Sequence, residues 1–190
     1  MNSKAFERTV LTIAVLVLAA SVGALAQTSA ITTFAGEINA YSPVLTTTPV
    51  TGPYEIRGPW SLKSNGNGKA DFTADLNMEE SDGWCMTQNG SNFDPAARNA
   101  HTHHITLLDG AVTSITGGFQ VSGSATIMGN GSISSKLSPS VLTVEVTGGT
   151  DDKFSNITLT FASPASDHFG TEPVAGVVRS VMKSGTSKKK

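Results

Sequence analysis

Two stretches of the chain alternate apolar and polar side chains, and this alternation constrains the fold more than any other feature. In both stretches the apolar side chains have even residue numbers: Tyr54, Ile56, Trp60 and Leu62 in the first, and Phe72, Ala74, Leu76 and Met78 in the second. Side chains two residues apart lie on one face of a β-strand, so each stretch predicts a strand with one buried face. The intervening Asn65-Gly66-Asn67-Gly68 supplies the positive φ that a tight turn requires. The sequence therefore predicts a β-hairpin whose even-numbered side chains face the core.

Short apolar stretches separated by glycine-containing turn signals predict further strands along the rest of the chain. The turn signals are Asp109-Gly110, Gly117-Gly118, Gly129-Asn130-Gly131 and Gly148-Gly149. The predicted strands are residues 31–39, 103–108, 111–115, 119–128, 141–146, 154–161 and 174–182. Roughly nine short strands predict an all-β fold, a single antiparallel β-barrel or β-sandwich. Short turns pair strands that are neighbours in sequence, which favours meander-like hairpins and hence a barrel.

One long polar segment, residues 87–100, interrupts the strand pattern because its side chains do not alternate. It contains Asp94-Pro95-Ala96-Ala97-Arg98, in which an aspartate precedes a proline and two alanines. Aspartate is a preferred N-cap residue and proline suits the first helical position. We therefore expect one short helix within a long loop. Loops on a rigid β scaffold often carry binding residues.

The two ends of the chain do not fit the β pattern. Residues 1–26 carry Lys4 and Arg8, then an apolar run, then Ala24-Leu25-Ala26, which matches an export signal. The alternative is an uncleaved membrane anchor at the short limit of a spanning length. We expect residues 27–182 to form one all-β domain in a secreted or periplasmic protein, and residues 183–190 to form a disordered basic tail. Cys85 is the only cysteine, so an intramolecular disulfide is excluded.

The charge distribution makes nucleic acid an unlikely type of partner. The chain has 13 basic and 15 acidic side chains, and three of the basic ones are the terminal Lys188 to Lys190. The predicted domain is thus acidic and lacks the basic patch that binds phosphates. Its glycine pairs lie between strands rather than before a helix, which excludes a phosphate-binding loop, and no G-x-S-x-G motif indicates a serine hydrolase.

The histidines are the residues most indicative of chemistry. His101, His103 and His104 occur within four residues, at the start of a predicted strand. In an extended strand His101 and His103 share one face, about 7 Å apart at Cα, and His104 points the opposite way. A His-x-His pair of this kind is a potential zinc or copper site. The candidate remaining ligands are the fourth histidine, His168, and the carboxylates Asp167, Asp109 and Glu172, and Asp167 or Asp94 would otherwise orient a ligand imidazole.

Other roles for the histidine cluster remain open at this point. The imidazoles could form a hydrogen-bonded patch at the start of a strand, serve in acid–base chemistry without a metal, or titrate together near neutral pH. For the whole protein, the sequence favours a non-enzymatic domain that binds a small ligand, a metal or a component of the cell envelope. The alternatives are a metal-dependent enzyme using the His-x-His site and a self-associating surface protein.

Overall fold

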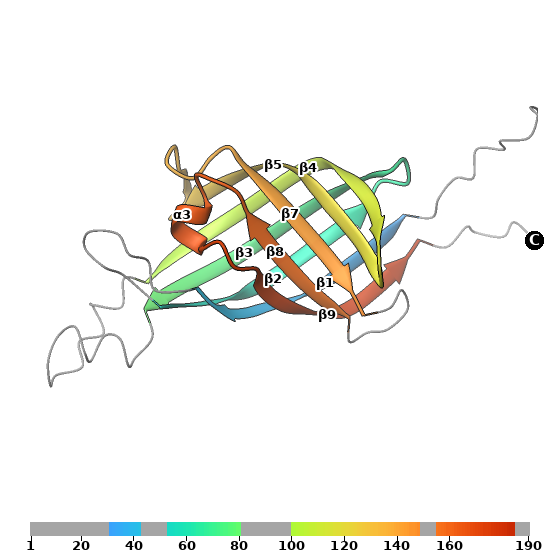
Figure 1. Ribbon diagram of the computed structural model, residues 1–190, viewed down its shortest axis with the longest axis horizontal. Helices are drawn as coiled ribbons and strands as arrows, with labels where there is room; N and C mark the ends of the chain where they lie inside the picture. Colours follow the sequence, from blue (N-terminus) through green and yellow to red (C-terminus); the bar gives the residue numbers. More distant parts are fainter. Residues whose placement is uncertain (1–30, 43–52, 81–99, 149–154, 185–190) are drawn as a thin grey trace, which may run out of the picture.

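The computed structural model describes residues 31–42, 53–80, 100–148 and 155–184, which form nine strands and one short helix (Figure 1). The bounds of these elements are β1 Thr32–Tyr41, β2 Tyr54–Ser64, β3 Lys69–Glu80, β4 His101–Ile115, β5 Gly118–Gly129, β6 Ser132–Ile133, β7 Ser140–Thr147, β8 Asn156–Phe161, α3 Ser166–Phe169 and β9 Val174–Lys183. No helix within these ranges has the length and apolar character needed to cross a membrane.

Eight of the strands close into one antiparallel barrel, which confirms the all-β prediction and selects the barrel over the sandwich. The hydrogen-bonded order is β4-β3-β2-β1-β9-β8-β7-β5, and pairing of β4 with β5 closes the ring. Each strand therefore lies beside strands that are near it in sequence, except where β1 pairs with β9. The short strand β6 pairs only with the end of β5. The meander-like arrangement is the one that short connections favour.

The predicted hairpin is confirmed, and so is its buried face. β2 and β3 pair antiparallel, with Trp60 opposite Ala74 and Leu62 opposite Phe72. All the even-numbered apolar side chains named for this hairpin are buried. The turn between the strands contains Gly66 at φ 76° and Gly68 at φ 75°, as expected for the Asn-Gly signals. The apolar residues of all eight strands fill the barrel interior, which is the usual state of a small barrel.

The prediction of a turn at Asp109-Gly110 is wrong, because β4 runs without a break from His101 to Ile115. The two residues form a β-bulge, where the register with β5 shifts between Leu107 and Ala111. Asp109 has φ 53°, and a Cβ atom on Gly110 would overlap the side chains of Leu107 and Val121. An Asp-Gly pair supplies the same backbone freedom to a bulge as to a hairpin turn, so this signal alone does not distinguish them.

The helix of the structure, α3, lies in the connection from β8 to β9 and was not predicted from the sequence. It lies at one end of the barrel (Figure 1). The helix predicted at residues 94–98, the export signal at 1–26 and Cys85 lie outside the described residues. The same holds for residues 185–190 of the predicted tail, whereas Lys183 belongs to β9.

Candidate metal site

The first residues of β4 present two histidines to the barrel interior. His103 is 4% exposed and His101 is half-buried. They share a face because they are two residues apart in a strand. On the opposite face His104 is exposed, and its Nδ1 lies 2.6 Å from a carboxylate oxygen of Asp75 on β3. The predicted division of the cluster into an inner pair and an outer histidine is thus present.

The third histidine of the inner group comes from α3, at the same end of the barrel. Backbone hydrogen bonds from Phe169 N–H to Ala165 O and from Gly170 N–H to Ser166 O, each 2.9 Å, form this single helical turn. Phe169 is fully buried and stacks on Phe161 of β8, with ring centroids 4.3 Å apart. Because burial of Phe169 fixes the rotation of the turn, His168 is directed towards β4.

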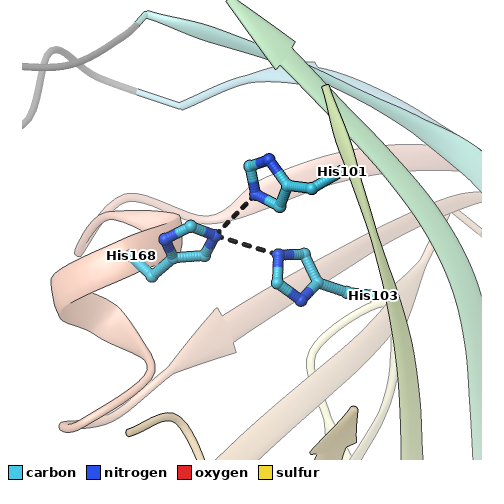
Figure 2. Close-up of side chains that lie close together, drawn as sticks. All are labelled: His101, His103 and His168. Atoms are coloured by element: carbon cyan, nitrogen blue, oxygen red, sulfur yellow. Dashed lines mark hydrogen bonds between the residues drawn. The ribbon is translucent and has the colours of Figure 1, made fainter. Parts of the chain in front are cut away.

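The ring nitrogens of His101, His103 and His168 converge on one small volume (Figure 2). Nε2 of His168 lies 3.1 Å from Nε2 of His101 and 2.9 Å from Nε2 of His103. One candidate ligand nitrogen from each residue lies within 4.8 Å of the other two. Metal–nitrogen bonds of about 2.0–2.1 Å in a tetrahedral zinc site place the nitrogens about 3.3 Å apart. The two separations that involve His168 are therefore close to those of a metal-binding triad.

Hydrogen bonds between the rings do not fully satisfy the three converging nitrogens. The Nε2 atom of a neutral imidazole carries either one hydrogen or one lone pair in the ring plane. His168 Nε2 contacts two other ring nitrogens, so it cannot form an optimal hydrogen bond with both His101 and His103. A cation between the three rings would accept a lone pair from each of them. The geometry is thus compatible with a bound metal ion.

The environment keeps His103 and His168 in the uncharged form that a metal requires. Burial is the main cause that lowers the pKa of His103 to about 3, with further lowering by the charges of His168 and His101. Burial, followed by the charge of His101, lowers the pKa of His168 to about 4. Both rings are neutral at neutral pH, so metal binding would displace no proton from their nitrogens.

The Nδ1 atom of His103 faces the protein and has no hydrogen-bond partner of acceptable geometry. The backbone of Met128 nevertheless raises the pKa of this ring, in opposition to burial. Ligand histidines usually donate their second N–H to a carbonyl or carboxylate, which fixes the tautomer. In His103 this second contact is weak, and packing against a neighbouring ring holds the imidazole in position instead. The ring lies edge-on to Phe169, with ring centroids 5.0 Å apart.

The predicted candidates are only partly brought together. His101, His103 and His168 form one group, whereas Asp167 is exposed on α3 and does not belong to it, so its role stays a prediction. Sequence reasoning did not connect Tyr54 with the histidines. Its ring lies edge-on to His101, with centroids 5.7 Å apart. The even-numbered alternation of β2 placed Tyr54 inside the barrel but not at this end.

No protein-family model, no curated protein and no solved structure matches this chain.

Proposed function

We propose that this protein binds one divalent transition metal through His101, His103 and His168. The observation that supports this function is the convergence of three ring nitrogens from two separate elements, β4 and the β8–β9 connection. The ring of His103 is buried and those of His101 and His168 are half-buried at one end of the packed barrel. We infer a metal-binding domain that acts outside the cytoplasm, on the basis of the predicted export signal at residues 1–26.

The donor set favours zinc or copper. Imidazole nitrogen suits Zn²⁺, Cu²⁺ and Ni²⁺, whereas Mg²⁺ and Ca²⁺ prefer oxygen ligands. Within the described residues, the group at this site contains three histidines and no carboxylate. Copper(II) would bind more tightly than zinc to the same nitrogens in the usual order of affinities, so metal supply would decide which ion is bound.

Self-association through strand edges receives less support than metal binding. That hypothesis depended on strand edges that lack a partner. In the described part of the chain, each of the eight barrel strands pairs on both sides, so the closed ring offers no open edge for another copy to extend.

The proposal is tested by measuring metal content and affinity of the purified protein after chelation and dialysis against zinc or copper. We expect one equivalent of metal per chain. The His168→Ala variant should bind far more weakly, because its loss leaves only two ligands. His104→Ala is the matched control, since His104 belongs to the same cluster in sequence but is exposed on the outer face. Absence of stoichiometric binding, or equal loss in both variants, would overturn the proposal.

A further inference from the structure

We propose that the metal held by the three histidines keeps a fourth coordination position, and that this position takes a small anion from solution. This inference rests on the proposed metal site. Structural zinc sites are closed by four protein ligands, whereas sites with three protein ligands leave a position for water or another exogenous ligand. The group in the described part of the chain contains three ligand residues.

The charge of the site points to an anion as that fourth ligand. Imidazole binds a metal in its neutral form, so a divalent ion held by these three histidines would keep its full charge. No carboxylate belongs to the ligand group among the described residues. A charge that is taken out of water without a counter-charge is strongly destabilised. A small anion on the metal would neutralise part of this charge.

A solvent-open depression on the outer face of the barrel borders the ligand group at His101. It has a volume of about 450 Å³, and it is lined by His101 together with Met78 and Asn130. This volume is many times that of a small anion. Arg57 and Glu55 also line the depression and form an ion pair with each other, and Glu79 lines it as well, so an anion would be attracted by the metal and not by this lining. His101 and His168 are both half-buried, so solvent reaches the ligand group at these two rings.

Glu80 provides the main rival for the fourth position. It is the one acidic side chain among the buried residues of the described chain, 5% exposed, and it lies at the end of β3 opposite Tyr54. The ring of Tyr54 contacts His101, so Glu80 lies at the same end of the barrel as the metal site. The Glu80 carboxylate is not part of the histidine group. If it moved onto the metal, the site would be closed and would not bind an anion.

Cobalt(II) loading followed by titration with azide and then thiocyanate tests the inference. Visible absorption reports the coordination of cobalt(II), and it should change with each anion to a saturating end point. The His104→Ala control should respond in the same way, and His168→Ala should lose the stoichiometric cobalt(II) complex. If cobalt(II) does not bind to the parent protein, the proposed function fails. If cobalt(II) binds at one per chain but its spectrum ignores both anions, the metal site stands and the open position is refuted.

The Glu80→Gln variant identifies the cause of such a failure. An anion response of similar affinity in this variant and in the parent protein would support an open position. A response that is absent from the parent and appears only in Glu80→Gln would show that the carboxylate occupies the fourth position, and would overturn the inference. Circular dichroism of both proteins checks that the barrel is retained.

Discussion

Acidification is expected to destabilise the metal-free barrel through His103 and His168. Burial lowers the pKa of His103 to about 3 and that of His168 to about 4, from an ordinary value of 6.5. Below pH 6.5 the unfolded chain therefore binds protons that the folded chain does not, and the free energy of unfolding falls as pH falls. The loss begins near pH 6.5 and continues until the folded rings also titrate, near 4 and 3.

The size of the effect follows from these pKa values. A pH of about 5 is about 1.5 units below the pKa of an unfolded histidine. Each ring that stays neutral in the folded state therefore lowers the free energy of unfolding by about 2 kcal/mol at this pH. His103 is nearly inaccessible but His168 is half-buried, so solvent screens part of the interaction. If screening halves each contribution, the two rings together make the barrel about 2 kcal/mol less stable at pH 5 than at pH 8.

Urea unfolding of the chelated protein at a series of pH values measures this effect. The parent protein contains carboxylates that also titrate, so the informative quantity is a difference between variants. His168→Gln replaces one ring with a side chain that does not titrate, and the parent should lose about 1 kcal/mol more than this variant between about pH 8 and pH 5. The exposed His104 provides the control, because His104→Gln should leave the contribution of the inner rings in place.

A parent protein and a His168→Gln variant that lose the same stability on acidification would refute the reasoning. The result would mean that His168 takes up a proton as readily in the folded protein as in the unfolded chain. The packed cluster of His101, His103 and His168 would then not exist in solution, because burial beside other imidazoles is what disfavours the charged ring.

Three further outcomes are expected. Phe169→Ala should lower the free energy of unfolding by about 3–5 kcal/mol in urea titrations, because Phe169 is fully buried. The same variant should bind zinc more weakly in competition titrations. A stable variant with unchanged zinc affinity would contradict the role of Phe169 in positioning His168. Zinc at about one hundred times its dissociation constant should stabilise the parent by about 2.7 kcal/mol in thermal unfolding but leave His168→Ala nearly unchanged, whereas equal shifts would place the metal elsewhere. Gly110→Ala should cost about 1–3 kcal/mol in urea, because its methyl group would overlap Leu107 and Val121; a neutral result would show that the bulge has room.

The alternation of apolar residues predicted the barrel wall well, because a closed barrel has one interior and each strand buries one face. The even-numbered residues of β2 and β3 are buried as predicted. The same pattern failed at Asp109-Gly110, where the buried positions change from odd to even across the bulge: Leu107 faces inward and so does Gly110. A switch from odd-numbered to even-numbered buried residues at an Asp-Gly pair is compatible with both a turn and a bulge. Only the pairing of β4 with both of its neighbours distinguishes the two.

Within the candidate site, the sequence could predict only that His101 and His103 lie together, because both belong to one strand. The spacing of His101 and His103 defines their common face whatever the strand pairs with. The approach of His168 depends on the path of the β8–β9 connection and on the rotation of a turn only four residues long. That rotation is fixed by the stacking of Phe169 on Phe161, a contact between residues that no local pattern relates. For the same reason sequence spacing does not distinguish His168 from its exposed neighbour Asp167.

The three histidines come from two separate elements, and this determines how a bound metal would affect the stability of the protein. His101 and His103 lie on a strand that pairs along its length with β3 and β5, so their spacing is set by the barrel. His168 is positioned by Phe169 and Ala165, both of them part of the apolar core. Burial of apolar side chains thus brings the three histidines together, whereas in a zinc finger the metal itself brings the ligands together. A metal bound here would add a link between β4 and the β8–β9 connection, and it would stabilise the folded barrel by mass action.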